Sequence, residues 1–138
     1  MKPESQSSSE RSEPTKAELD ILTVLWKHGP STVRFVHEQL NTFKEVNYTT
    51  TLKQMQLMAE KGLLSRDESQ MKHIYGVAEE EQKTKSYLLD RFVNHLYDGS
   101  AGNLVMQLLD TKKASKDELK AIRALLDKLD EEEPNTQQ

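Results

Sequence analysis

The sequence predicts a mainly α-helical protein with one small β-hairpin, built as an N-terminal domain of three helices and the hairpin, then a C-terminal domain of three helices. Two observations predict this class. Apolar residues recur every three or four positions in six separate segments, which is the spacing of one helix face. After Gly62, the apolar pair Leu63-Leu64 precedes a polar loop at residues 67–70, which is typical of two strands joined by a turn.

The first helix is predicted to begin after Pro14 with a capping box. Thr15 and Glu18 stand three residues apart, the spacing at which each side chain can accept the other residue's backbone N–H. The segment His28-Gly29-Pro30 is expected to end this helix. Its apolar side is formed by Leu19, Leu22, Leu25 and Trp26.

A second, shorter helix is predicted after Ser31-Thr32. Residues 41–46 are polar and form a link to the third helix. Trp26 and Phe35 are expected to be the largest apolar contributors to the core of this domain. The residues at helical spacing in the second helix are Val33, Val36, His37 and Leu40.

The third helix has two chemically distinct faces, and Asn47 is expected to cap its first turn. The face expected to pack on the core carries Thr51, Leu52, Met55, Met58, Ala59 and Leu63. The opposite face carries Thr49, Thr50, Lys53, Gln54 and Gln56. Hydroxyls, amides and a cation are the groups that reach base edges and phosphates when a helix lies in the major groove. Such a face is also compatible with a plain solvated surface.

The hairpin completes a winged helix-turn-helix over residues 14–78, in which the third helix is the recognition helix and the hairpin is the wing. Arg66, Lys72 and His73 are expected to lie on its strands. On the recognition helix, the predicted DNA contacts are Tyr48, Thr49, Thr50, Lys53 and Gln54. On the wing and toward the DNA backbone, they are Lys16, Arg34, Lys44, Arg66, Lys72 and His73. Taken singly, each of these cations is better explained as an ordinary surface charge.

Charge is distributed unevenly along the chain, whose net charge is −4. Residues 14–78 hold eight Lys/Arg against seven Asp/Glu, whereas residues 79–138 hold nine against thirteen. A near-neutral domain can bind DNA if its cations gather on one side. The sequence therefore predicts a DNA-reading domain joined to an acidic helical domain.

Residues 79–133 are predicted to form a dimerisation domain of three helices, from about 79 to 97, after Ser100, and after the capping box Ser115-x-x-Glu118. Three thin helices cannot easily bury so much apolar surface alone, so a second copy is expected to cover it. The alternative is that these helices fold back on the first domain. A twofold dimer predicts a palindromic operator with half-sites about one or two helical turns apart. The expected interface residues are Leu88, Phe92, Leu96, Leu104, Val105, Leu108, Leu119, Ile122, Leu126 and Leu129.

Other classes of protein are disfavoured. His37-Glu38 begins like a zinc-protease helix, but Asn41 stands where the second His is required, and there is no phosphate-binding Gly-rich loop. The chain has no cysteine and no apolar run long enough to span a membrane. We therefore expect a cytoplasmic protein that is not an enzyme, with no cofactor, metal or small-molecule substrate. Residues 1–13 and 134–138 are expected to be tails, the first a Ser/Glu-rich disordered one.

Several segments together resemble the penicillinase repressors of the BlaI/MecI family. They are ELDILTVLWKHGPSTVRFVHEQL, YTT, EKGLLSR, the hairpin ending at Tyr75, LYDGSAGNLVMQLL and SKDELKAIRALLDKL, and the resemblance spans roughly residues 14–130. It implies a dimeric repressor of transcription whose third helix enters the major groove, with Thr49, Thr50 and Lys53 at the bases. The chain departs from the family's pattern at Thr51 and Leu57, so a relative's operator sequence does not transfer.

The resemblance also implies how such a repressor is released. A membrane-bound sensor protease, activated by a β-lactam or envelope signal, would cut inside the short helix that maps onto Leu104 to Leu109. The corresponding bond here is Gln107–Leu108. The rival interpretation is a winged-helix module that docks a partner protein and does not read DNA, because one fold serves several functions.

Overall fold

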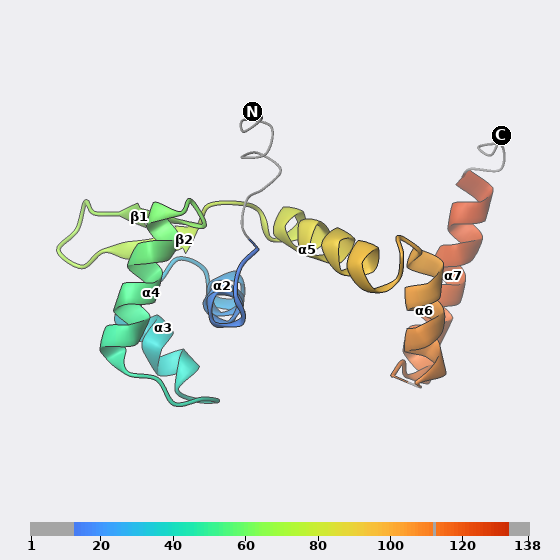
Figure 1. Ribbon diagram of the computed structural model, residues 1–138, viewed down its shortest axis with the longest axis horizontal. Helices are drawn as coiled ribbons and strands as arrows, with labels where there is room; N and C mark the ends of the chain where they lie inside the picture. The colour runs from blue at the N-terminus through green and yellow to red at the C-terminus, as the bar shows by residue number, and fades with distance from the viewer. Residues whose placement is uncertain (1–12, 112, 133–138) are drawn as a thin grey trace. The chain divides into compact units, whose positions relative to one another are not determined.

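The computed structural model describes residues 13–111 and 113–132, and within them the chain forms six helices and one two-stranded antiparallel sheet (Figure 1). This confirms the predicted fold class. The chain divides into two compact units, the first ending at Leu88 and the second beginning at Leu89. In chain order the elements are α2 (Lys16–His28), α3 (Val33–Leu40), α4 (Tyr48–Glu60), β1 (Leu64–Asp67), β2 (Ile74–Val77), α5 (Glu81–Leu96), α6 (Ala101–Asp110) and α7 (Lys116–Glu132).

Helix α2 begins with the predicted capping box. The hydroxyl of Thr15 accepts the backbone N–H of Glu18 (3.1 Å), and Glu18 Oε1 accepts the N–H of Thr15 (3.0 Å). The helix ends at Gly29, whose φ of +83° is readily adopted only by glycine and whose N–H donates to the carbonyl of Leu25 (2.7 Å). Both ends of this helix are therefore determined by local sequence.

Helix α4 begins after Asn47 and ends at Gly62, as predicted. Gly62 has a φ of +86°, its N–H donates to the carbonyl of Ala59 (3.2 Å), and the N–H of Leu63 donates to that of Met58 (2.9 Å). This is a Schellman motif. At the other end, Asn47 occupies the N-cap position as predicted, but its side chain does not make the expected capping hydrogen bond.

The sheet pairs β1 with β2, with Leu64 opposite Val77 and Asp67 opposite Ile74 (Figure 1). Residues 68–73 form the loop between the strands, so Lys72 and His73 lie in that loop and the prediction that placed them on strands was wrong. β2 also pairs with the segment before α3, since Ser31 and Tyr75 exchange backbone hydrogen bonds of 2.9 and 2.8 Å. The wing is thereby attached directly to the helical part of the first unit.

The core of the first unit lies between α2, α3, α4 and the sheet. Tyr75 is its largest fully buried side chain, at 1% exposure. Trp26 and Phe35 pack against this core but are only partly buried, so the prediction that they dominate it was wrong. The buried face of α4 is confirmed at Thr51, Met55 and Met58. The buried apolar residues are Ile21, Leu22, Val24, Leu25, Val33, Val36, Leu40, Met55, Met58, Leu64 and Tyr75.

The first unit extends into α5. Lys85 Nζ lies 5.5 Å from the centre of the Trp26 ring, and buried Thr84 donates to Glu79 Oε1 (3.0 Å). These contacts attach the beginning of α5 to the core. The division between the units falls inside α5, ten residues after the end of the predicted DNA-reading domain at residue 78.

The second unit holds the end of α5 together with α6 and α7. The hydroxyl of Ser100 caps α6 by accepting the N–H of Asn103 (3.0 Å), and Ser115 and Glu118 form the predicted capping box (3.1 and 2.8 Å). Neither α6 nor α7 contains a buried residue in the described part of the chain. Their exposed large apolar residues are Val105, Met106, Leu108, Leu125, Leu126 and Leu129.

Candidate nucleic-acid interface

The outer face of α4 carries the predicted base-reading residues, opposite the buried Thr51, Met55 and Met58. Thr49, Thr50 and Lys53 are exposed, and Tyr48 is 39% exposed. Gln54 is half-buried at the edge of this face. The first carboxylate of the helix is Glu60, at its last residue. The face can therefore donate and accept hydrogen bonds without repelling a polyanion.

An aromatic and cationic cluster joins the first turns of α3 and α4. The guanidinium carbon of Arg34 lies 5.2 Å from the centre of the Tyr48 ring, within the range of a cation–π interaction. The His37 ring also packs edge to face against the Tyr48 ring, with ring centroids 5.5 Å apart. The sequence predicted Arg34 and Tyr48 as separate contacts, and the structure brings them together.

A cavity of about 380 Å³ lies between this cluster and the wing loop. Arg34 and Tyr48 line it from the helices, and Lys72 and His73 line it from the loop. Four residues predicted as DNA contacts therefore share one surface, although 38 positions separate the first from the last of them in sequence. Sequence analysis missed Met71, which also lines this cavity and is 95% exposed. The available signal was an apolar residue inside a polar loop. The full lining is Thr32, Val33, Arg34, Tyr48, Leu52, Gln56, Met71, Lys72, His73 and Tyr75.

Side-chain hydrogen bonds organise the wing. Arg66 Nε lies 2.6 Å from Glu68 Oε2, and its Nη1 lies 3.5 Å from the Tyr75 hydroxyl. The hydrogen bond to Tyr75 raises the pKa of Arg66. At the start of the loop, Asp67 Oδ1 accepts the N–H of Ser69 (2.9 Å). Hydrogen bonds from the backbone and side chain of Ser69 lower the pKa of Asp67. The loop that carries Lys72 and His73 therefore begins with a fixed turn.

Two of the predicted backbone contacts lie elsewhere. Lys44 Nζ is 2.9 Å from Asp20 Oδ2 and is half-buried, and Lys16 Nζ is 4.0 Å from Asp20 Oδ1. Asp20 neutralises part of the charge that these lysines would offer to a phosphate. Neither lysine lines the cavity formed by Arg34, Tyr48 and the wing loop.

Asn41, which stands where a zinc-protease helix would need its second histidine, has a structural role. The Asn41 amide nitrogen lies 3.1 Å from Nε2 of His37, one turn earlier in α3. His37 Nδ1 in turn lies 3.4 Å from the hydroxyl of Thr51 on α4. Across the described ranges, no three His, Asp or Glu side chains are placed to hold a metal ion.

The residues predicted for dimerisation lie on α5, α6 and α7. Phe92, Leu96, Val105, Leu108, Leu126 and Leu129 are exposed in the single chain. Leu88, Leu104, Leu119 and Ile122 are half-buried. Most of this apolar surface is therefore open to solvent.

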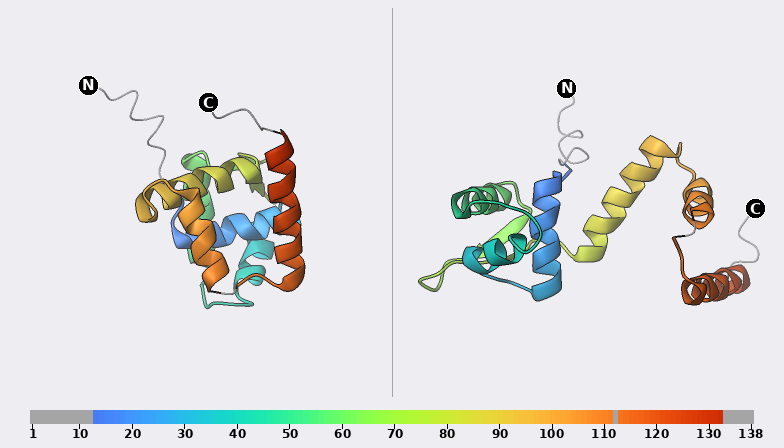
Figure 2. Two further views of the ribbon diagram at one scale, coloured as in Figure 1. Left: turned by 90° about the vertical axis from the view of Figure 1, so that its right-hand side faces the viewer. Right: turned by 90° about the horizontal axis from the view of Figure 1, so that it is seen from below.

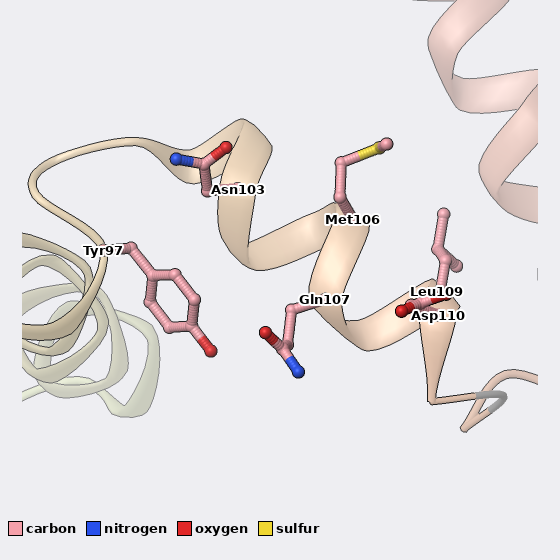
Figure 3. A pocket seen from close by; sticks show the side chains of 6 residues that line it. All are labelled: Tyr97, Asn103, Met106, Gln107, Leu109 and Asp110. Atoms are coloured by element: carbon pink, nitrogen blue, oxygen red, sulfur yellow. The ribbon is translucent and has the colours of Figure 1, made fainter.

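The candidate cleavage bond lies within helix α6. Gln107 borders an open cavity of about 820 Å³ that is also lined by Tyr97, Asn103, Met106, Leu109 and Asp110 (Figure 3). Leu108, on the other side of the bond, is 45% exposed. Both residues are in regular helix.

No helix in the described part of the chain is long and apolar enough to cross a membrane.

Comparison with known proteins identifies the family. The penicillinase repressor family matches residues 14–128. The methicillin resistance regulatory proteins MecI of Staphylococcus aureus (strain N315) and Staphylococcus epidermidis are each 22% identical to this chain over 114 residues, covering 83% of this chain and 93% of theirs. A transcriptional regulator from Thermotoga maritima of known structure is 15% identical, with a TM-score of 0.48 over 91% of this chain and 84% of that one. The family consists of transcriptional repressors, which are not enzymes. The chain therefore belongs to the penicillinase repressor family.

Proposed function

We propose that this repressor binds operator DNA in a sequence-specific manner, with α4 in the major groove and the wing loop against the backbone. The observation that carries the proposal is the shared surface formed by Arg34, Tyr48, Lys72 and His73 beside the carboxylate-free face of α4. Cations beside a polar helix face suit a duplex, because phosphates flank the groove that carries the base edges.

Within this surface, the side chains have different roles. Thr49, Thr50 and Lys53 face the bases, and Arg34 and Lys72 contact phosphates. Tyr48 holds the Arg34 guanidinium in place through the cation–π contact. Arg34 is therefore partly ordered before DNA binds, which reduces the entropic cost of binding. Lys16 and Lys44 contribute less, since both lie beside Asp20.

The repressor acts as a homodimer through α5, α6 and α7. The exposed apolar stripe of α7, which includes Leu125, Leu126 and Leu129, supports this, because burying such a side chain contributes about 1.5–3 kcal/mol. A second copy would cover the stripe and place two recognition helices on a palindromic operator. Losing either half of the dimer would remove the gain from binding both half-sites at once.

Release from DNA occurs by proteolysis at or near Gln107–Leu108 in response to a β-lactam or envelope signal. The bond lies in a ten-residue helix without a buried side chain. A protease requires an extended substrate, and a short helix with few buried contacts opens locally at low cost. Cleavage there would separate α7 from the DNA-reading unit. The sensor protease and a role in antibiotic resistance are further parts of this proposal.

Fluorescence anisotropy with a labelled duplex from the promoter upstream of this gene tests DNA binding. Log affinity should fall linearly with log salt concentration as counterions are released, and unlabelled operator should compete far better than an unrelated duplex of equal length. A winged-helix module that binds only protein would give neither result. Salt-dependent binding without preference for the promoter would reject sequence-specific recognition while keeping DNA binding.

A further inference from the structure

Leu57 is an apolar side chain on the outer face of α4. It is 48% exposed, whereas the residues on the inner face, Thr51, Met55 and Met58, are at most 1% exposed. A single exposed leucine is common on protein surfaces and needs no explanation by itself. Its position relative to the base-facing residues is what gives it a role.

Leu57 follows Lys53 by four residues and Thr50 by seven. Residues at these separations lie on one stripe of a helix, so the three side chains point the same way. Helices that lie in the major groove present residues to the bases over a stripe of this length. The next residue of the stripe is Glu60, a carboxylate at the end of α4. Leu57 is therefore the last member of the stripe that can approach a base edge without adding negative charge.

The chemistry of the groove then limits what Leu57 can contact. In the major groove, the edges of adenine, guanine and cytosine present hydrogen-bond donors and acceptors, whereas thymine also presents its C5-methyl group. A leucine cannot satisfy a donor or acceptor, and covering one would cost the desolvation of that group. We propose that Leu57 determines specificity by packing on a thymine methyl group in each half-site. This inference rests on the proposed DNA binding of α4.

The proposal is tested by a double-mutant cycle between protein and DNA. Duplexes enriched by the wild-type chain from a random pool supply the site, and each of its thymines is replaced in turn by uracil, which lacks only the methyl group. At one position per half-site, uracil should weaken wild-type binding about fourfold, the value of one buried methyl-sized group. Leu57→Ala should bind the thymine and uracil duplexes equally. Leu57→Met, which keeps an apolar side chain, should retain most of the discrimination.

The possible outcomes distinguish a failure of the proposed role of Leu57 from a failure of the proposed DNA binding. Alanine favours helix at least as well as leucine, so Leu57→Ala should keep its thermal unfolding midpoint, and circular dichroism verifies this. Equal losses on uracil substitution in wild type and Leu57→Ala, at every position, would overturn the role of Leu57 while leaving DNA binding intact. Failure of the wild-type chain to enrich any sequence would instead reject the proposed function itself.

Discussion

The ammonium group of Lys61 lies 2.7 Å from Oε2 of Glu18, and this ion pair joins the residue after α4 to the first turn of α2. Glu18 is 4% exposed, and its other carboxylate oxygen accepts the N–H of Thr15. The capping box of α2 and the end of α4 are thus linked through one carboxylate. Figure 2 shows the α2, α3 and α4 ribbons of this unit from two further directions.

Replacing Lys61 by methionine should destabilise the protein by about 1–3 kcal/mol. The substitution removes the charged donor and leaves the Glu18 carboxylate buried with fewer partners, and hydrogen bonds to charged groups have values in this range. Chemical denaturation of the full chain measures the change. The matched control is Lys53→Met on the same helix, because Lys53 is exposed and forms no ion pair within the described ranges. Equal stability losses in the two variants would contradict this role of Lys61.

Acid should weaken the same link. Burial raises the pKa of Glu18, but the hydrogen bonds from Lys61 and Thr15 together outweigh burial and hold that pKa below its ordinary value. A depressed folded-state pKa contributes stability that is complete above the unfolded-state pKa, near 4.5, and is lost as pH falls through the folded-state pKa. The free energy of unfolding of wild type should therefore approach that of Glu18→Gln as the pH drops from about 6 toward about 3, an interval that spans the unfolded-state pKa. A difference that stays constant over this interval would show that Glu18 does not titrate as the structure indicates.

Arg34→Ala should weaken DNA binding by a similar factor on all sequences and reduce the slope of log affinity against log salt by about 1. The reason is the loss of the proposed phosphate contact of Arg34, whose guanidinium lies against the Tyr48 ring. Anisotropy titrations at four or more salt concentrations give the slope. Lys27→Ala removes an exposed cation from the last turn of α2 and should leave the slope unchanged. An unchanged slope for Arg34→Ala would remove Arg34 from the interface.

Leu126→Asp should convert the proposed dimer into a monomer. A carboxylate in the centre of an apolar interface would be desolvated without a partner, which costs more than the contact contributes. Light scattering should give about 32 kDa for wild type, twice the 15.9 kDa chain, and about 16 kDa for the variant. Ala124→Asp places the same side chain on the other side of α7 and should remain dimeric. A wild-type mass of about 16 kDa at micromolar concentration would refute the dimer.

Local sequence determined much of the fold. The capping boxes at Thr15 and Ser115 and the glycines after α2 and α4 fix the helix ends, because each depends on residues within a few positions of one another. The buried face of α4 followed from its three- and four-residue spacing. These features depend on hydrogen bonds and periodicity that a short segment contains by itself.

Tertiary contacts could not be predicted in the same way. Nothing near Lys44 in sequence indicates that Asp20, 24 positions earlier, neutralises it. Tyr75 is buried in the core, and its backbone pairs with that of Ser31, a contact between distant segments. Arg34 and Tyr48 were each predicted from residue type, but their stacking depends on how α3 and α4 pack. The residues predicted to contact DNA could be recognised one by one from the sequence. Only the structure shows that Arg34, Tyr48, Lys72 and His73 line one cavity.

Selection from a random pool of duplexes, with wild type compared with the Thr50→Ala/Lys53→Ala double variant, tests the central claim most directly. Wild type should enrich a palindrome with half-sites about one or two helical turns apart. The double variant should keep salt-dependent binding through Arg34 and Lys72 but enrich no sequence, since phosphate contacts position a protein and base contacts specify the site. Enrichment of the same palindrome by the double variant, or of none by wild type, would contradict the assignment of α4 as the base-reading element.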